Sequence, residues 1–187
     1  MIKCVLLDGT EMEIQSLKEI NEKGIATQIK ELYCNGNKLV SLKGLEQCVN
    51  LQELHCYYNQ LESLEGIEGC YNLKKLHCYS NQLVSLKGLE NCVNLQILYC
   101  GNNQLETLKG LEKCAILQVL CCGNNQLKTL EGIENCTILQ RLNCWENQIT
   151  TLKGLEKCAM LQKIYCSNNK LETLKGLEQC VILQKLY

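Results

Sequence analysis

Hydrophobic residues recur along this chain with a period of 22 residues, and the period is clearest between residues 51 and 73. The pattern there reads L-x-x-L-x-C-x-x-N-x-L, and it occurs in seven consecutive copies from residue 29 to residue 183. Apolar residues at alternate positions predict a short strand in each copy, with these side chains on one face. Stacked copies would place the strands in a parallel sheet and bury one continuous core.

The remainder of each copy is too short for a long helix. Residues 86–92, Leu-Lys-Gly-Leu-Glu-Asn-Cys, contain a glycine, so we expect a single turn of 3₁₀ or α-helix on the convex side. The asparagine that ends each strand, such as Asn59, can both donate to and accept from the backbone of the following turn. We therefore predict a ladder of asparagines along the stack.

The pattern resembles the leucine-rich repeat, with cysteine in place of its third leucine. The 22-residue length is similar to the repeats of bacterial internalins and of the phosphatase regulatory subunit built the same way. The cysteine columns look more like cysteine-containing repeats of protists, giant viruses and some bacteria. The resemblance implies an α/β solenoid, a horseshoe with a parallel concave β-sheet, which binds macromolecules and carries out no chemistry.

The two ends of the chain depart from the repeat. Residues 1–28 are expected to form an N-terminal cap, either a hairpin around Asp8-Gly9 or a degenerate first repeat, followed by a short helix at 17–23. Ser16-Leu17-Lys18-Glu19 fits a capping box for that helix. Residues 29–187 hold the seven repeats and the first strand of an eighth, without a C-terminal cap. An exposed apolar end would favour homo-oligomers formed end to end.

Fourteen of the sixteen cysteines fall in two columns of the repeat. One column lies on the core face of the strand, as at Cys56, and the other lies three residues before the leucine that opens the next copy, as at Cys70. Both positions suit small buried hydrophobic residues, and equivalent side chains on parallel strands point the same way rather than toward each other. We expect reduced thiols in a cytoplasmic protein; a disulfide ladder in a secreted protein is the alternative.

Charge and composition exclude several classes of partner. The 19 basic and 20 acidic residues leave a net charge of −1, which favours neither nucleic acid nor an acidic membrane surface. No apolar run approaches the length of a membrane span, and the N-terminus lacks the apolar region of a signal peptide. No catalytic set or phosphate loop is recognisable, so neither an enzyme nor a cofactor is expected.

The positions that point outward from the strands carry most of the aromatic residues. Tyr and Trp supply contact area at a small cost in conformational entropy, so such a surface is typical of a binding site. The preference of strands for aromatic residues would also account for their presence. We expect a protein partner to bind the concave face at the following residues: Glu53, His55, Tyr57, Tyr58, His77, Tyr79, Tyr99 and, as a second anchor, Trp145.

Two chemical alternatives on this face are weaker. His55, His77 and Glu53 could form a two-histidine, one-carboxylate metal site, but the nearby Lys75 opposes a cation, so no metal is expected. Cys121 should project onto the same face as an ordinary exposed thiol prone to oxidation. On the convex side a column of glutamates alternates with lysines, which indicates a solvated surface rather than a cation site.

The leading hypothesis is therefore a non-enzymatic protein-interaction module that uses its concave β-face. The alternatives are a structural array that assembles through the C-terminal end, and a thiol or metal function of the cysteine columns.

Overall fold

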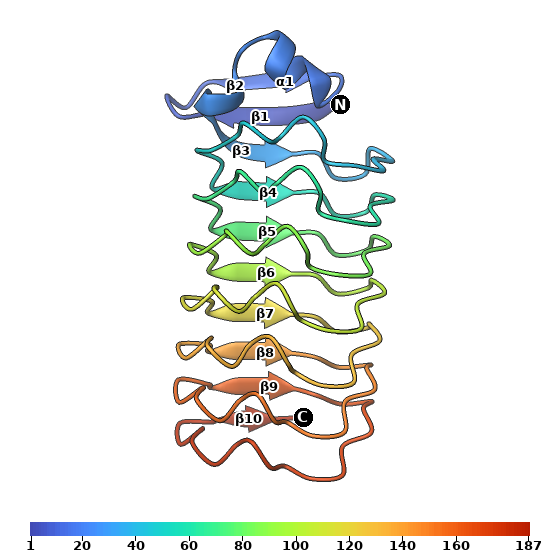
Figure 1. The fold of residues 1–187 in the computed structure, drawn as a ribbon, viewed down its shortest axis with the longest axis vertical. Coiled ribbons are helices and arrows are strands. Elements are labelled where there is room, and N and C mark those ends of the chain that lie inside the picture. The colour runs from blue at the N-terminus through green and yellow to red at the C-terminus, as the bar shows by residue number, and fades with distance from the viewer.

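The computed structural model describes all 187 residues as a stack of coils with one strand in each coil (Figure 1). Ten strands form a single sheet in the order β10-β9-β8-β7-β6-β5-β4-β3-β1-β2. Strands β3 to β10 are parallel, and each pairs with the strand 22 residues away. The predicted solenoid with a parallel sheet is confirmed. The strand bounds are β3 Ile29–Tyr33, β4 Glu53–His55, β5 Lys75–His77, β6 Ile97–Tyr99, β7 Val119–Cys121, β8 Arg141–Asn143, β9 Lys163–Tyr165 and β10 Lys185–Leu186.

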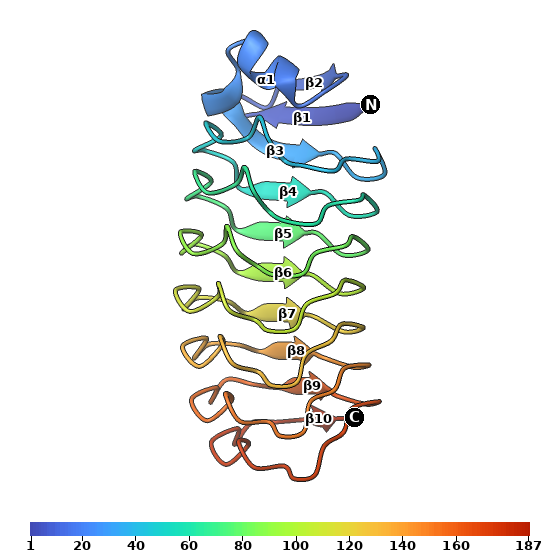
Figure 2. The ribbon, with the colours of Figure 1, turned by 45° about the vertical axis from the view of Figure 1, so that its right-hand side comes forward.

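The N-terminal residues form a hairpin that extends the sheet beyond β3 (Figures 1 and 2). Its strands are β1 Ile2–Leu6 and β2 Glu11–Ile14, and β1 runs antiparallel to both β2 and β3. The sequence left two arrangements open for this segment, a hairpin and a degenerate first repeat. The structure has the hairpin, because a degenerate first repeat would add a parallel strand. The hairpin supplies hydrogen-bonding partners to the exposed edge of β3.

A short helix, α1 Lys18–Glu22, and a 3₁₀ turn, η1 Ala26–Gln28, connect the hairpin to β3. The predicted capping box does not form as expected. Leu17 takes the N-cap position without a side-chain bond, and Glu19 Oε1 accepts from the Gln15 amide at 2.8 Å. The carboxylate still satisfies an amide ahead of the helix, but one residue earlier than the motif predicts.

The core is a single column of 53 buried apolar residues, and both cysteine columns belong to it. Cys56 and Cys70 are fully buried. In the second column the six thiols from Cys70 to Cys180 each also donate to a carbonyl in the preceding coil, as Cys114 Sγ does to Cys92 O at 3.6 Å and Cys136 Sγ to Cys114 O at 3.4 Å. These thiols point along the stack toward backbone oxygens, so they form a ladder of weak S–H···O bonds.

The asparagine ladder is present and crosses from coil to coil. Asn103 Nδ2 donates to the carbonyl oxygens of Cys100 at 3.0 Å and of Cys78, in the preceding coil, at 3.1 Å. Its Oδ1 accepts from the amide of Leu83 at 3.0 Å. A single amide side chain therefore satisfies backbone groups of two consecutive coils where the strand ends.

The connections on the far side of each coil contain turns and no helix. In one coil the amides of Leu45, Cys48 and Leu51 each donate to the carbonyl three residues earlier. These bonds are of the 3₁₀ type, but they follow one another without overlapping, so the backbone does not continue as a 3₁₀ helix. A glycine with φ near 110° recurs beside them, as at Gly110. A Cβ there would lie 2.7 Å from the oxygen of Leu86 in the preceding coil, so only glycine fits.

Candidate binding surface

The sheet buries one face in the core and exposes the other, which we call the strand face. Register on the strand face is strict, because each strand pairs with the equivalent residues of its neighbours. Two columns of side chains therefore run along it. The first is Glu31, Glu53, Lys75, Ile97, Val119, Arg141, Lys163 and Lys185. The second is Tyr33, His55, His77, Tyr99, Cys121, Asn143 and Tyr165.

Four consecutive rings of the second column are in contact. The ring centroids of Tyr33 and His55 lie 4.6 Å apart in a stacked arrangement, and those of His55 and His77 lie 4.3 Å apart. The ring of Tyr99 meets His77 edge-on, with centroids 4.6 Å apart and an interplanar angle of 89°. The four rings form a continuous aromatic row across β3 to β6.

A second group of rings lies beside this row, just after the buried cysteines. Tyr57 and Tyr79 stack with centroids 4.6 Å apart and planes only 6° from parallel. Tyr58 packs edge-on against both of them and is 63% exposed. Tyr57 and His55 are also edge to face at 6.1 Å, so the two groups join into one aromatic cluster.

Glu53 connects the aromatic cluster to the charges of the first column. Its Oε1 lies 2.7 Å from Nε2 of His55, and its Oε2 accepts from Nζ of Lys75 at 3.1 Å. Burial alone would raise the pKa of the Glu53 carboxyl, but the bonds from His55 and Lys75 outweigh it, so the pKa is lowered. Glu53 is therefore an anion that holds both neighbours in place.

Burial also controls the ionisation of two rings in the row. It lowers the pKa of His77 to about 4, and the positive charges of His55 and Lys75 add to the effect. It raises the pKa of Tyr33 to about 12, together with the bond from the Tyr33 hydroxyl to Glu31 Oε2 at 2.7 Å. Both rings are neutral at physiological pH.

The structure brings seven of the eight candidate residues together. These seven are Glu53, His55, Tyr57, Tyr58, His77, Tyr79 and Tyr99. Trp145 lies apart, with its indole directly over Gly123 of the preceding coil, where any side chain would collide with the ring. Tyr33 joins the cluster although it is not among the eight, and its position one period before His55 is the signal that indicates it.

Cys121 differs from the expectation of an exposed, oxidation-prone thiol. The side chain is partly buried between its column neighbours, and this burial raises the pKa of the thiol to about 11, against the opposing effect of Arg141. The thiolate that reacts with oxidants is therefore scarce at neutral pH. No group of three or more His, Cys, Asp or Glu side chains in the structure has the geometry to hold a metal ion.

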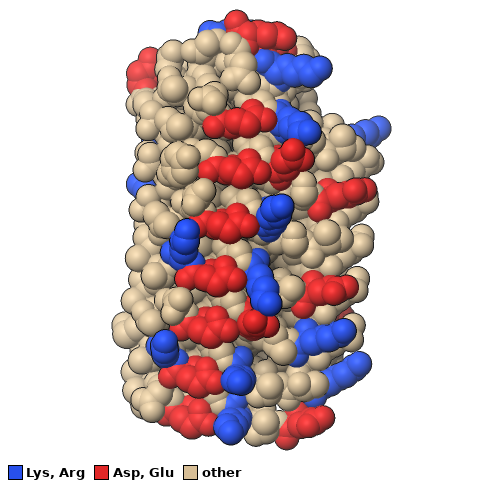
Figure 3. Space-filling view, viewed as in Figure 1, with Lys and Arg blue, Asp and Glu red and all other residues tan.

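A second exposed surface runs along the turns and carries a column of acidic side chains beside a mostly basic one (Figure 3). The glutamates of this column have a structural role that charge patterning did not predict. Each accepts a hydrogen bond from the glycine amide two residues earlier, as Glu156 Oε2 does from Gly154 at 2.7 Å. The equivalent glutamates are Glu46, Glu68, Glu90, Glu112, Glu134 and Glu178.

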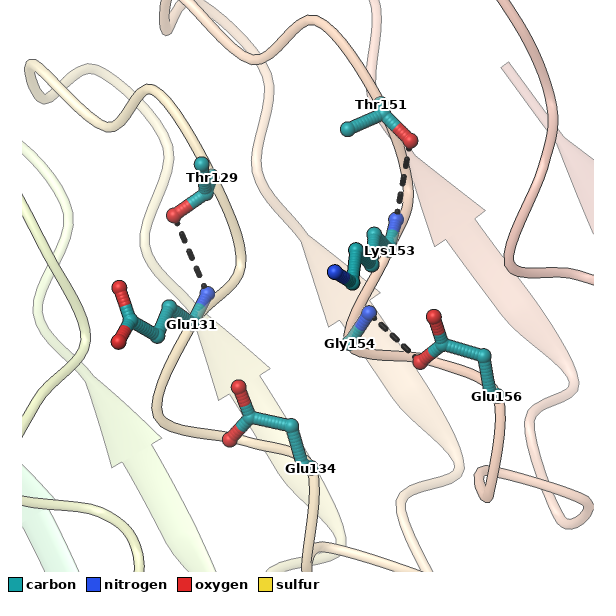
Figure 4. Close-up of a pocket in the computed structure, with 7 residues that line it drawn as sticks. All are labelled: Thr129, Glu131, Glu134, Thr151, Lys153, Gly154 and Glu156. Atoms are coloured by element: carbon teal, nitrogen blue, oxygen red, sulfur yellow. Dashed lines mark hydrogen bonds between the residues drawn. The ribbon is translucent and has the colours of Figure 1, made fainter.

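A shallow pocket on this surface lies between two successive turns (Figure 4). Thr129 and Thr151 accept from the amides of Glu131 and Lys153, both at 3.3 Å, while Glu156 is held by Gly154. The same groove recurs at Ser63, Glu65, Glu68, Ser85 and Lys87. A pocket that repeats with the coil belongs to the frame and does not mark a particular site.

Comparisons with known proteins agree with this geometry. The family described as "Leucine Rich repeats (2 copies)" matches residues 27–69, 71–113, 117–157 and 139–179. No curated protein matches the chain in sequence. None of the helices has the length and apolar character needed to cross a membrane.

Three of the similar solved structures come from two bacteria. An internalin (inlF) of Listeria monocytogenes superposes with a TM-score of 0.77 at 22% identity, over 86% of this chain and 48% of that one. A leucine-rich repeat protein of Leptospira interrogans gives 0.74 at 30% identity, over 80% and 40%. The functional domain of InlJ from L. monocytogenes, which includes a cysteine ladder, gives 0.67 at 25% identity, over 88% and 40%. The chain thus spans less than half the length of these three proteins.

Proposed function

Because this chain belongs to the leucine-rich repeat family, whose members typically act as protein-interaction modules, we propose that its strand face binds a protein partner at the aromatic cluster. The observation that carries the proposal is the contact network of seven rings that includes His55, Tyr57 and Tyr79. Stacked rings are held in place before a partner arrives, so binding them costs little further conformational entropy. The repeat frame is usually non-catalytic, and this role requires no chemistry.

The exposed side chain of Tyr58 supports a role beyond the frame. Tyr58 has φ of 53°, a left-handed conformation in which bulky side chains are rare, and the equivalent residues of the following coils share it: Ser80, Asn102, Asn124, Glu146 and Asn168. Asparagine adopts this conformation readily, whereas tyrosine does so at a cost. The repeat imposes this conformation in every coil, and at Tyr58 it holds an exposed ring against Tyr57 and Tyr79.

The cluster also defines the kind of partner surface that fits. Its rings are apolar on their faces, and Tyr57, Tyr58 and Tyr79 make no side-chain hydrogen bond within the chain. Their hydroxyl groups are free to donate to and accept from a partner. We propose an apolar segment with backbone or side-chain amides at its edges as the contacting element.

The experiment is a capture assay with Tyr57→Ala/Tyr79→Ala as the test variant. Immobilised wild-type protein is used to select partners from a lysate of the source cell, and bound proteins are quantified by mass spectrometry. We expect a partner that the wild type retains and the double variant loses. Truncating two central aromatic residues removes a binding hot spot, and this weakens the binding free energy by about 2 kcal/mol or more.

Tyr71→Ala is the matched control, because Tyr71 is 50% exposed but lies outside the cluster. It should retain the same partner. Thermal unfolding of all three proteins shows whether a loss of binding reflects a loss of folding. A partner retained equally by the wild type and the folded double variant would contradict the proposal.

A further inference from the structure

The strand face has a second feature, a hollow that begins where the aromatic row ends. In the second column small side chains follow Tyr99, and the next ring is that of Tyr165. The hollow lies between these two tyrosines, over the small side chains and beside two basic ones. The residues that define it are Tyr99, Cys121, Arg141, Asn143, Lys163 and Tyr165.

The basic residues at the edge of the hollow have no partner within the chain. Arg141 is the only arginine in the sequence, and neither Arg141 nor Lys163 takes part in an ion pair. They face each other in register on β8 and β9, and Lys163 in turn faces Lys185 on β10. Like charges directly opposite each other in a sheet are destabilising, so folding alone gives no reason for this arrangement.

At the N-terminal end of the same column, opposite charges are paired within the chain. There Glu53 lies between Glu31 and Lys75 and binds the lysine at 3.1 Å. No carboxylate lines the hollow around Arg141, and its floor is uncharged, because the Cys121 thiol is protonated at neutral pH. The missing countercharge must come from outside the chain.

We propose that this hollow receives the carboxylate of an aspartate or glutamate in an extended segment of the protein partner. The guanidinium of Arg141 binds both carboxylate oxygens through two parallel N–H bonds, and the Lys163 ammonium adds a third donor. The rings of Tyr99 and Tyr165 line the hollow at its two ends and offer apolar surface beside the carboxylate. The inference rests on the proposed function and adds the charge of the partner segment.

Continuity with the aromatic cluster sets the shape of that segment. Tyr99 belongs to both the row and the hollow, so one extended chain crosses the strands from the cluster to the basic pair. An apolar part would lie on the rings and an acidic residue would follow it at a fixed spacing. The acidic residue would set the register of the segment on the strand face.

The test uses random peptides displayed on phage and selected on the wild-type protein. Arg141→Gln/Lys163→Gln removes the basic pair, and Lys113→Gln/Lys157→Gln removes two exposed lysines on the turn side as a control of equal charge. We expect Asp or Glu at one fixed position among peptides selected by the wild type and by the control. The Arg141→Gln/Lys163→Gln variant should bind these peptides about tenfold more weakly or worse.

A selected peptide is then synthesised with blocked termini in two forms, one with the acidic residue and one with its amide. The change to amide should weaken binding to the wild type and have no effect on the Arg141→Gln/Lys163→Gln variant. An equal effect on both proteins would overturn the inference, as would selected peptides without a fixed acid. Peptides whose binding is weakened by Tyr57→Ala/Tyr79→Ala but not by Arg141→Gln/Lys163→Gln would overturn the inference and leave the proposed function standing. A selection that yields no binding peptides would overturn both the inference and the proposed function.

Discussion

The imidazole rings of His55 and His77 lie in contact, with centroids 4.3 Å apart, because the two residues pair in register on β4 and β5. Tyr99 covers the other side of His77, and the nearest charged side chains are those of Glu53 and Lys75. Burial and the positive charges of His55 and Lys75 lower the pKa of His77 to about 4, while Glu53 opposes the shift. His77 is therefore neutral throughout the physiological pH range.

This pKa predicts the pH dependence of stability. The unfolded chain protonates His77 at its ordinary pKa of 6.5, whereas the folded chain does so only near 4. Between these values the unfolded state binds more protons, so the wild type loses stability as pH falls from 6.5 to 4. His77→Gln removes this group, and the variant should lose less stability over the same range, as measured by denaturant unfolding. A proton NMR titration in which His77 titrates near 6.5 would contradict the assignment.

The asparagine ladder predicts a large loss of stability on truncation. Asn103→Ala leaves the amide of Leu83 and the carbonyls of Cys78 and Cys100 without this partner. We expect the free energy of unfolding to fall by about 1–3 kcal/mol, measured by denaturant titration. Gln104→Ala is the control, because its exposed side chain makes no bond, and it should change stability by no more than about 0.5 kcal/mol.

Two glycines with positive φ separate the cost of backbone conformation from the cost of a steric collision. Gly110 has φ of 109° and no room for a Cβ, whereas Gly36 has φ of 66° and nothing within 4 Å of that position. Gly36→Ala should cost about 1 kcal/mol from backbone conformation alone. Gly110→Ala should cost clearly more, since the collision with Leu86 O adds to the conformational cost. Equal unfolding midpoints for the two variants would show that the neighbouring coil moves aside freely.

The buried thiols predict a slow reaction with Ellman's reagent. Burial raises the pKa of Cys34 and Cys78 to about 12, so few thiolates exist at neutral pH. The native protein should react slowly and mainly at the partly buried Cys121, and Cys121→Ala should remove most of that reaction. In concentrated guanidinium without reductant all sixteen thiols should react, as in a protein of a reducing compartment. A count below sixteen would indicate disulfides.

The frame of this molecule could be predicted from the sequence because it repeats. A pattern seen once leaves strand and helix open, but seven copies of one spacing fix the buried Leu54 and Cys56 and the strand-ending Asn59. The same regularity hid the role of the glutamates. A column of Glu beside Lys looks like a solvated surface, and the bond from the Gly110 amide to Glu112 follows only from the turn geometry.

The residues that lie on the candidate site could be predicted from the sequence, but the contacts between their side chains could not. Period 2 indicates that His55 and Tyr57 point outward, and period 22 places Tyr79 beside Tyr57. Whether rings stack depends on side-chain rotamers, which the pattern does not determine. Trp145 illustrates the limit, since its indole lies over Gly123 in a place that only the empty glycine position makes available.

Each ladder asparagine from Asn59 to Asn169 bonds to two consecutive coils, and this limits how the chain can change in length. Removing residues 95–116 would join Asn94 to Leu117 and leave every remaining rung intact, whereas a deletion one residue longer or shorter would misalign all coils beyond it. His77 would then have Cys121 as its neighbour in place of Tyr99. Inserting or deleting whole coils can thus change which side chains are neighbours on the strand face, while the asparagine ladder and the core of the other coils stay as they are.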